Sequence, residues 1–439
     1  MPKTDKIFEL IKNEEMRQSS TLMMIPSENY TYPEVHKAVG SVLMHKYAEG
    51  QPRKRYYQGN ENVDSIEETA EQLALEVFKL DPEEWHVNVQ PYSGTPANLA
   101  IYNALLEPGD KIMAMYLPDG GHLSHGWIYK GNSITFTSKI FDINFYHVEP
   151  ETGVFDYDEI LRQAIKIKPK LLISGGTAYP REIDHQKMGE IAKAVGAYYL
   201  ADVAHEAGLI AGGANASPFD YADAVTMTTH KTLRGPRGAL AFVRKEYAEA
   251  LDKSIFPGLQ GGPHLHTIAG IAVSLEKTKS EEFKKYAIQT VKNAQVLSDS
   301  LKEKGYEVVS GGTDKHLVLV DLRNRNVNGW FAAWALEKAG IIVNRNTVPG
   351  EDGSPYYPSG IRLGTPALTV RGMKEPEIQQ IAEWIDEVLA FIGERTVPED
   401  ADERKVVTKN FLKYIENEPK LGEIKTLVTA LTSKFPLPF

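Results

Sequence analysis

The stretch Ala224-Val-Thr-Met-Thr-Thr-His230-Lys231 decides the fold, together with Tyr198-Tyr-Leu-Ala-Asp202-Val-Ala-His205. Each is a short apolar run that ends in polar residues, which is typical of a buried strand in a parallel sheet. If the two strands are parallel, Asp202 and Lys231 emerge at the same edge of the sheet, where ligands of such sheets usually bind. A capping Asp and a solvated Lys are the commoner interpretation of each residue alone, so the pair carries the prediction.

More strands of the same sheet are predicted from further apolar runs, with helix-period stretches between them. The strands are expected at Lys111–Met115, Leu171–Ile173 and Ala239–Val243, and the helices at Ala97–Leu106 and Met188–Val195. Strands that alternate with helices indicate an α/β fold with a mainly parallel sheet and helices on both faces.

The pattern changes after Val273 and predicts a smaller α/β domain. A helix capped by Ser280 is expected to run to Gly305, because apolar residues recur there at helical spacing. Strands follow at Glu307–Val309, Leu317–Leu322 and Ile341–Val343, then a helix at Gln379–Phe391, a break at Val397–Arg404 and a helical tail. We predict an arm over 1–55, a large cofactor-binding domain over 56–276 and a small C-terminal domain over 277–439.

Composition excludes several classes of function. Lys plus Arg number 49 against 59 Asp plus Glu, and a net charge of −10 disfavours general binding of nucleic acid or anionic membranes. The sequence has no cysteine, which excludes disulfides, thiolate nucleophiles and Cys-type zinc sites. We expect a cytoplasmic protein, since no apolar run approaches the roughly 18 residues of a membrane helix and the N-terminus lacks a signal-peptide core.

The strand-end residues suit one cofactor in particular. A buried lysine can form a Schiff base with a carbonyl cofactor, and a nearby carboxylate can keep a pyridine nitrogen protonated. Those are the groups that pyridoxal 5'-phosphate needs. Ser93-Gly94-Thr95 precedes a predicted helix and could hold the phosphate, although such a triplet is more often a simple cap.

Three loops add candidates whose roles the residues alone leave open. In Gly120-Gly-His122-Leu-Ser-His125-Gly a histidine could stack on a flat cofactor, form half of a metal pair or stay a loop residue. The glycine-rich loop at 256–264 is either functional or a connector. Arg362, in Gly360-Ile-Arg-Leu-Gly-Thr365, suits a carboxylate clamp and a structural ion pair about equally.

Several motifs together resemble serine hydroxymethyltransferase. They are Ile25-Pro-Ser-Glu-Asn-Tyr30, Lys46-Tyr-Ala-Glu-Gly50, Lys54-Arg-Tyr-Tyr57, Thr228-Thr-His-Lys-Thr-Leu233 and Gly235-Pro-Arg-Gly238. The resemblance is ordered along the chain and covers roughly Leu22 to Ala367. The Thr-Thr-His-Lys-Thr-Leu run and the preceding Asp-Val-Ala-His are highly specific to that family.

The resemblance implies a fold type I pyridoxal-phosphate enzyme that works as a homodimer with shared active sites. Its reaction reversibly transfers the hydroxymethyl carbon of L-serine to tetrahydrofolate, giving glycine and 5,10-methylenetetrahydrofolate. For the cofactor the resemblance implies Lys231 as the covalent link and Asp202 at the pyridine nitrogen. It implies His122 stacked on the ring and His205 near the phenolic oxygen. The residues that it implies at the phosphate are Ser93, Gly94, Thr95 and the neighbouring subunit's Tyr47 and Gly262. For the substrates it implies Arg362 and Ser27 at the amino-acid carboxylate, the neighbour's Glu49 at the serine hydroxyl and the folate, and Leu117, Leu123 and Asn346 along the folate pocket. Tyr57 and Thr226 are implied as supporting residues and His230 as a residue that shapes the choice of reaction; no metal is implied.

Some positions depart from the family's pattern. Thr95 stands where many members have serine, and Gly176–Arg181 differs mildly from the usual version. Tyr356-Tyr357 follows Ser354-Pro355 in a loop that borders the folate pocket, where the family often has Phe. The segment Thr408–Glu423 is extra, and we assign it no function.

Other functions stay open at this point. The nearest is a folate-independent aldolase for β-hydroxy amino acids, against which Glu49, Asn346 and the Tyr56-Tyr57 pair count. A metallohydrolase could use Asp202, His205, His122 and His264, but it would leave the Lys231 motif without a task and no His-Glu-x-x-His helix is present. A non-enzymatic binding protein is the third alternative, and a methanopterin relative could replace folate as the carrier.

Overall fold

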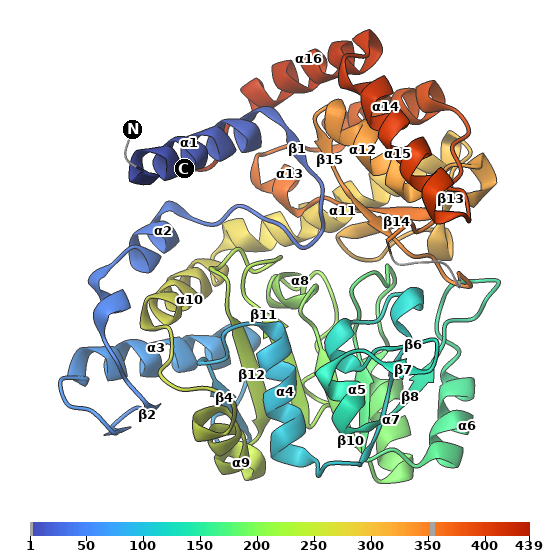
Figure 1. Cartoon of the computed structure of the whole chain (residues 1–439). Coiled ribbons are helices and arrows are strands. Elements are labelled where there is room, and N and C mark those ends of the chain that lie inside the picture. The colour runs from blue at the N-terminus through green and yellow to red at the C-terminus, as the bar shows by residue number, and fades with distance from the viewer. Residues whose placement is uncertain (1–2, 352–355) are drawn as a thin grey trace. The chain divides into compact units, whose positions relative to one another are not determined.

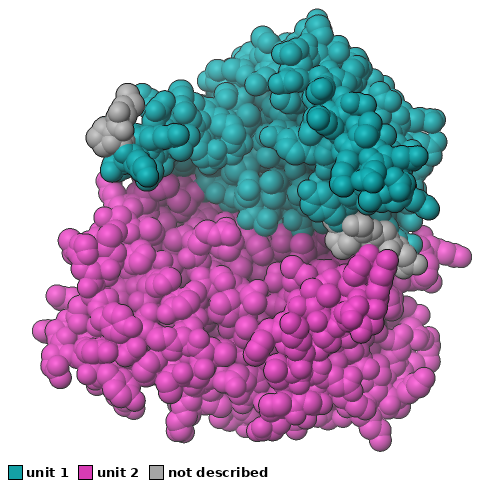
Figure 2. Space-filling model, in the orientation of Figure 1, with its two compact units in different colours: residues 1–30, 289–439 teal, residues 31–288 magenta. Residues whose placement is uncertain are grey.

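The chain forms two compact units in the computed structural model, which describes residues 3–351 and 356–439 (Figure 2). Unit 1 comprises residues 1–30 and 289–439, and unit 2 comprises residues 31–288. Along the sequence, the division after residue 288 falls within helix α11 (Glu281–Glu303). The division into an arm and two domains at residues 55 and 276 stays a prediction.

Unit 2 is built around a seven-stranded sheet with the order β4-β12-β11-β10-β9-β5-β8 (Figure 1). The strands are β4 (Trp85–Asn88), β5 (Lys111–Met115), β8 (Asp142–Tyr146), β9 (Leu171–Ser174), β10 (Tyr198–Asp202), β11 (Ala224–Thr228) and β12 (Ala239–Arg244). Within this sheet β12 alone runs opposite to the other strands. The predicted mainly parallel sheet is therefore confirmed.

Helices cover both faces of this sheet, because alternate side chains of each strand point to opposite sides. Leu200 packs in one core cluster with Ala97 and Ile101 of α4 (Gly94–Leu105). Tyr199 points the other way and meets His185 of α7 (His185–Val195). The remaining helices of unit 2 are α2 (Pro33–Val39), α3 (Glu61–Phe78), α5 (Phe136–Ile140), α6 (Tyr157–Ile167), α8 (Ala207–Ala211), α9 (Ala248–Lys253) and α10 (Leu265–Thr278). Short helical turns lie at Val42–His45, Leu117–Asp119, Leu123–His125, Lys245–Tyr247 and Ser254–Leu259, and two small hairpins pair β2 (Gly50–Gln51) with β3 (Lys54–Arg55) and β6 (Ile128–Tyr129) with β7 (Asn132–Ser133).

Unit 1 contains a four-stranded antiparallel sheet with the order β13-β14-β17-β16. Its strands are β13 (Glu307–Val308), β14 (Leu317–Asp321), β16 (Asn344–Asn346) and β17 (Gly360–Gly364). The unit's other elements are α1 (Lys3–Ser20), β1 (Leu22–Met23), α12 (Gly329–Lys338), β15 (Ile341–Ile342), α13 (Pro366–Val370), α14 (Glu375–Ile392), α15 (Ala401–Glu416), α16 (Pro419–Lys434) and short turns at Val309–Gly311 and Arg323–Arg325. One apolar cluster joins the sheet to these helices, including Val320, Phe331, Ile385 and Phe411.

Local signals set the ends of the long helix that was predicted after Ser280. The Ser280 hydroxyl accepts a hydrogen bond from the Phe283 amide at 3.2 Å, as an N-cap does. Gly305 follows the helix with φ +79°, a conformation that glycine adopts without steric cost. Ile341–Val343, in contrast, does not join the four-stranded sheet, because β15 pairs with β1 near the N-terminus. Among the described residues no helix combines the length and apolarity that crossing a membrane requires.

Candidate active site

Two neighbouring strands of unit 2 end at the centre of the candidate site. β10 and β11 run parallel, and Asp202 is in register with Thr226. Both side chains point to the face of the sheet that α4 covers, where they meet Asn98. Lys231 follows the end of β11 and is buried, with 8% of its surface exposed. The two predicted strand ends thus lie at one edge of the sheet.

The amide of Asn98 connects the polar groups of this centre. Its Nδ2 donates hydrogen bonds to Asp202 Oδ2 and to Ser124 Oγ, each at 2.8 Å. Its Oδ1 accepts a hydrogen bond from the hydroxyl of Thr226 at 2.5 Å. Because a neutral amide has one accepting and one donating end, these partners fix its orientation. Asn98 is buried, so the arrangement is shielded from water.

A second donor, His125, holds the carboxylate of Asp202 in its charged form. His125 Nε2 lies 2.9 Å from Asp202 Oδ2, and the Ala204 amide donates to Oδ1 at 3.1 Å. Burial by itself raises the pKa of Asp202, but the hydrogen bond from His125 and the nearby His122 outweigh it and hold that pKa well below its ordinary value. Asp202 is therefore an anion at neutral pH.

Lys231 is preceded by a histidine that stays neutral. Burial, with contributions from Lys231 and Arg237, lowers the pKa of His230 to about 3. Within the described structure its buried Nδ1 has no hydrogen-bond partner. An uncharged imidazole beside a buried lysine can accept or donate one hydrogen bond without adding positive charge.

Ser93 is the N-cap of α4, and Gly94 and Thr95 are its first residues, at a helix end that could hold an anion. Ser93 has an extended backbone, and no capping hydrogen bond of its side chain is found among the described residues. A Cβ on Gly94 would lie 2.9 Å from Thr228 Cγ2, so glycine lets the start of this helix approach the end of β11. Free amides at a helix N-terminus attract phosphate groups.

The glycine-rich loop predicted around Gly262 is held by Tyr92, which directly precedes Ser93 in the sequence. The Tyr92 hydroxyl donates to the Gly262 carbonyl at 2.8 Å, and the Tyr92 amide donates to Gln260 Oε1 at 3.1 Å. Gln260 in turn donates to the Gln90 carbonyl at 2.9 Å. These hydrogen bonds fix the loop beside the residue that precedes Ser93.

A second group of predicted residues gathers around Glu49. The Tyr57 hydroxyl donates to Glu49 Oε2 at 3.1 Å, and this hydrogen bond, together with the negative charge of Glu49, raises the pKa of Tyr57. The rings of Tyr47 and Tyr57 meet edge to face with centroids 5.4 Å apart. A Cβ on Gly262 would lie 3.1 Å from the Tyr47 ring. We call Tyr47, Glu49, Tyr57 and Gly262 the Glu49 cluster; both of its tyrosines are exposed.

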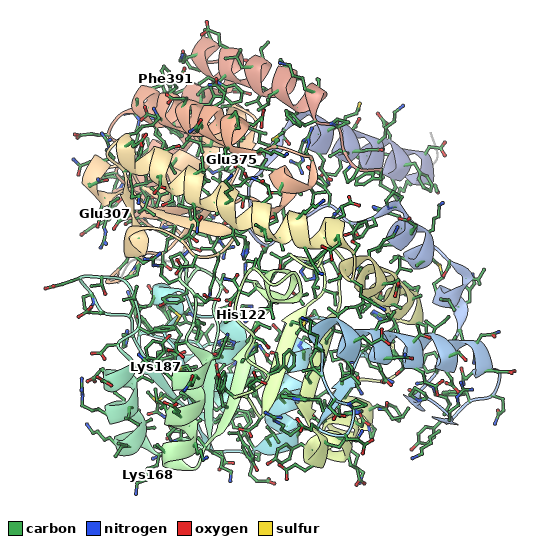
Figure 3. All side chains as sticks on the ribbon, turned by 180° about the vertical axis from the view of Figure 1, so that it is seen from behind. His122, Lys168, Lys187, Glu307, Glu375 and Phe391 are labelled. Atoms are coloured by element: carbon green, nitrogen blue, oxygen red, sulfur yellow. The ribbon has the colours of Figure 1, made fainter. Side chains whose placement is uncertain are left out.

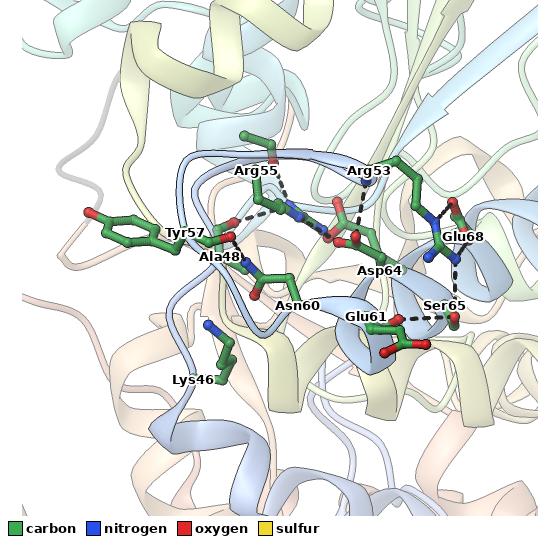
Figure 4. A network of polar contacts seen from close by, with 12 residues as sticks. Lys46, Ala48, Arg53, Arg55, Tyr57, Asn60, Glu61, Asp64, Ser65 and Glu68 are labelled. Atoms are coloured by element: carbon green, nitrogen blue, oxygen red, sulfur yellow. Dashed lines mark hydrogen bonds and ion pairs between the residues drawn. The ribbon is translucent and has the colours of Figure 1, made fainter.

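Arg55 holds the backbone on both sides of Glu49. Figure 4 shows its contacts with Ala48 and Asp64. Its Nη1 donates to the carbonyls of Ala48, at 3.0 Å, and of Gly50. Its Nε and Nη2 bind two carboxylates of α3, Asp64 at 2.8 Å and Glu67 at 2.5 Å. The side chains of Arg55, Asp64 and Glu67 are at most 7% exposed. The position of Glu49 is therefore set by a buried ion pair.

In unit 1, Arg362 lies in the middle strand of a ladder. It is paired with Leu319 of β14 on one side and Asn344 of β16 on the other. Its Nε lies 3.3 Å from Asn344 Oδ1. Burial lowers the pKa of Arg362 to about 10, so the guanidinium stays charged at neutral pH. A buried, charged and planar donor of this kind suits a carboxylate.

Two further predicted residues of unit 1, Asn346 and Ser27, lie near the ends of β17. Asn346 ends β16 opposite Gly360, and its Nδ2 donates to the Thr347 carbonyl at 2.7 Å. Ser27 follows the segment whose Met24 carbonyl accepts the Gly364 amide at 2.7 Å. Asn346 and the segment before Ser27 thus lie at opposite ends of β17, the strand that carries Arg362.

The other predicted residues of unit 2 lie in loops near the strand ends. His122 accepts the Ser124 amide at 3.2 Å and lies 2.7 Å from its hydroxyl. Figure 3 shows His122 and Lys168 at opposite ends of the sheet. His205 is buried in the turn after β10. Leu117 is half-buried, whereas Leu123 is 51% exposed.

Sequence reasoning missed Asn98, Ser124 and His125 as parts of the site. His125 stood in the quoted histidine loop, and Asn98 lies one turn beyond Thr95, but neither position carries a signal for contact with Asp202. The described residues form three groups: the Glu49 cluster, the strand of Arg362, and a group that we call the Asp202 centre. The Asp202 centre comprises Asn98, Ser124, His125, Asp202, Thr226 and the neighbouring Lys231.

His122, His125 and Asp202 also place one possible ligand atom each within 4.8 Å of one another. Hydrogen bonds account for this proximity, because His125 binds Asp202 and His122 binds Ser124. His264, which the metallohydrolase alternative needs, stacks instead on Tyr92 with ring centroids 4.2 Å apart. The geometry therefore does not favour that alternative.

Comparison with known proteins finds similarity to serine hydroxymethyltransferases. The family profile of serine hydroxymethyltransferase matches residues 1–385. The chain is 50% identical over 416 residues to a serine hydroxymethyltransferase of Acidothermus cellulolyticus, covering 92% of this chain and 94% of that protein. It is 49% identical over 437 residues to the Methanosarcina barkeri protein of the same name, covering 99% and 98%. A cytosolic serine hydroxymethyltransferase of Candida glabrata is 43% identical over 449 residues, covering 98% and 95%.

Proposed function

The chain belongs to the serine hydroxymethyltransferase family, and we propose that the three groups of residues described above carry out the family's reaction in it. The reaction is the reversible transfer of the hydroxymethyl carbon of L-serine to tetrahydrofolate, with glycine and 5,10-methylenetetrahydrofolate as products. The observation that supports our assignment of roles is the charged Asp202 at the strand end beside that of Lys231.

The Asp202 centre fits pyridoxal 5'-phosphate, the cofactor on which the family depends. Ser93, Gly94 and Thr95 offer amides and hydroxyls for the phosphate at the start of α4. Gly175, with φ +110°, lies directly against the backbone of Asp202: a Cβ on Gly175 would be 2.0 Å from the Asp202 carbonyl oxygen. Because only glycine fits here, no side chain of residue 175 occupies the edge of the sheet beside Asp202. When bound, the cofactor supplies an electron sink for the bond that breaks in serine.

Each residue of this centre then has a physical task. Lys231 holds the cofactor through its amine. Asp202 keeps a proton on the pyridine nitrogen, because an adjacent anion favours the charged ring. When the cofactor is bound, His122 would stack on its ring and His205 would lie near its phenolic oxygen. Thr226 acts through Asn98, whose amide it orients against Asp202.

Arg362 binds the carboxylate of serine, with help from Ser27. Its guanidinium keeps its charge despite burial, and Asn344 fixes the orientation of Nε. A planar donor pair that is already held in place selects a carboxylate by geometry as well as by charge. His230, which stays neutral, shapes the choice of reaction without competing for that carboxylate.

Glu49 moves a proton at the serine hydroxyl, and Tyr57 holds its carboxylate in place. We assign the Glu49 cluster to the site of a second subunit of a homodimer, where Tyr47 and Gly262 also reach the phosphate. The exposure of Tyr47 and Tyr57 in the single chain is what such an arrangement requires. Leu117, Leu123 and Asn346 line the pocket for tetrahydrofolate, and we place the enzyme in the cytoplasm.

A rate comparison tests this function against a folate-independent aldolase. Purified holoenzyme is given L-serine, and glycine is measured with and without tetrahydrofolate. We expect strong stimulation by tetrahydrofolate, because the transferred carbon needs an acceptor. Equal rates in the two arms would contradict the proposal and support the aldolase.

A further inference from the structure

Helix α15 (Ala401–Glu416) is an integral part of unit 1. It overlaps the segment Thr408–Glu423, to which the sequence assigned no function, and it begins at Ala401, inside the stretch Val397–Arg404 that was predicted as a break. The Asp400 carboxylate caps it by accepting the amides of Asp402 and Glu403 at 3.0 and 2.9 Å. Phe411 and Ile415 are buried in the core of the unit. The helix lies beyond residue 385, where the family profile ends.

Aromatic contacts connect α15 to the residues just before β17. The Phe411 ring meets Phe331 edge to face at 4.8 Å and lies 6.2 Å from Trp330, which lies 6.2 Å from Tyr357. Asn328 adds a polar link, because its Oδ1 caps the Trp330 amide at 3.0 Å and its Nδ2 donates to the Tyr357 carbonyl at 2.8 Å. Tyr357 is half-buried against this core.

Arg404 of α15 contacts Tyr357 directly. Its guanidinium carbon lies 5.3 Å from the centroid of the Tyr357 ring. The guanidinium is held by the turn before the helix, since Nε donates to the Pro398 carbonyl at 2.9 Å and Nη2 to the Glu399 carbonyl. A cation fixed over an aromatic face restrains the ring.

Tyr357 in turn belongs to a short stem that enters β17. The Pro358 carbonyl accepts the Gly329 amide at 2.8 Å. The amide and hydroxyl of Ser359 donate to Glu351 Oε1 at 2.9 and 2.8 Å. We call Tyr356–Ser359 the stem. Ser354 and Pro355, which precede it in the sequence, lie outside the described residues.

The stem affects the position of the end of the β16–β17 pair, at Asn346 and Gly360, more than the position of its middle, at Arg362. Arg362 is held by ladder partners on both sides, Leu319 and Asn344. Asn346 is the last residue of β16, and its ladder partner Gly360 directly follows the stem. A shift of the stem would therefore move the surroundings of Asn346 before it moved Arg362.

We propose that α15 determines the affinity for the reduced pterin carrier, with Arg404 and Phe411 as positioning residues that hold the stem beside Asn346. The proposal rests on the proposed function, because that function places Asn346 in the carrier pocket. Serine binding at Arg362 and cofactor binding in unit 2 do not depend on the stem.

The test compares Arg404→Met with Arg395→Met in the full-length holoenzyme. Arg395 is a matched control for the contact with Tyr357, since its guanidinium lies 5.8 Å from the ring of Tyr414, another aromatic residue of α15, whose ring shows no contact with the stem among the described residues. For Arg404→Met we expect KM for tetrahydrofolate to rise roughly tenfold, the change that corresponds to losing a partly desolvated cation–π contact. KM for serine, kcat and the visible spectrum of the cofactor should stay within about twofold, and Arg395→Met should resemble wild type.

Two further measurements separate positioning from general stability. Arg404→Lys keeps a cation over the ring and should recover part of the carrier affinity. Direct titration of tetrahydrofolate into the glycine-bound enzyme should show the same loss as KM for Arg404→Met. Equal rises of KM for serine and for tetrahydrofolate, or a lowered melting temperature with an unchanged KM for tetrahydrofolate, would overturn the inference. A wild-type enzyme without folate stimulation would instead overturn the proposed function.

Discussion

The buried clamp at Arg55 makes the sharpest prediction about stability. Arg55→Met keeps an unbranched stem but removes the guanidinium that binds Asp64, Glu67 and the two carbonyls around Glu49. Asp64 and Glu67 would then be buried without their cation. Removing one partner of a buried ion pair costs about 3–5 kcal/mol, because the remaining charge is left uncompensated.

The neighbouring Arg53 is a matched control for this substitution. Arg53 also binds a carboxylate of α3, Glu68 at 2.6 Å, but the two side chains are 53% and 42% exposed (Figure 4). Exposed pairs contribute about 0–1 kcal/mol, so Arg53→Met should leave stability nearly unchanged.

Urea unfolding at one fixed protein concentration measures both variants, since unfolding of an oligomer depends on concentration. Arg55→Met should lower the unfolding midpoint well beyond Arg53→Met, and catalysis should fall as well because Glu49 loses its fixed backbone. Arg55→Lys, which keeps the charge but loses the fork, should lie between them. Equal midpoints for the two methionine variants would refute the reasoning.

Three other substitutions test single residues. Lys231→Ala should keep the fold but lose the cofactor's covalent link; a visible band unchanged after dialysis would mean that another lysine holds it. Arg362→Lys should weaken serine binding by about 1.5–3 kcal/mol, through loss of a bidentate charged contact, and leave cofactor binding intact; an unaltered serine titration would remove Arg362 from this role. Burial, with Glu67 and Asp252, raises the pKa of Glu71 from 4.5 to about 8. The folded state therefore holds an extra proton between those values, and stability should fall as pH rises through them, by at most about 1.4 kcal/mol per pH unit. Glu71→Gln should flatten the dependence of the unfolding midpoint between pH 5 and about 9; an unchanged slope would exclude Glu71 as its source.

The positions of strands and helices could be predicted from local sequence patterns. Strand direction and strand pairing could not, because they depend on distant parts of the chain. The apolar runs at Lys111–Met115 and Ala224–Thr226 are strands, because buried strands need continuous apolar residues whatever surrounds them. The same pattern carries no direction, so the reversed β12 could not be foreseen. The partner of Ile341 lies at Leu22, a pairing that only the folded chain brings about.

Some site residues could likewise be predicted from their local sequence, whereas others could be recognised only from their neighbours in the folded chain. Lys231 and Asp202 stood out because polar residues end apolar strands, and the family resemblance added roles for them. Asn98 and His125 did not, because an Asn or His becomes part of a site through the partner it meets, here a carboxylate far along the chain. The segment Thr408–Glu423 looked extra, because it departs from the family's pattern. The structure shows that Phe411 and Ile415, in the part of α15 that falls within it, are buried.

The central claim is that one active site is built from the Asp202 centre of one subunit, which includes Lys231, and the Glu49 cluster of another. Mixing Glu49→Gln with Lys231→Ala tests it most directly, because a hybrid dimer collects both lesions in one site and neither in the other. Random exchange gives about half of the dimers as hybrids, so activity in the folate-coupled assay should recover to roughly a quarter of wild type, while each variant alone stays nearly inactive. Subunit exchange under mild denaturant, with hybrids verified by mass, is the measurement. No recovery despite verified hybrids would contradict the shared site and return Glu49 to the site of its own subunit.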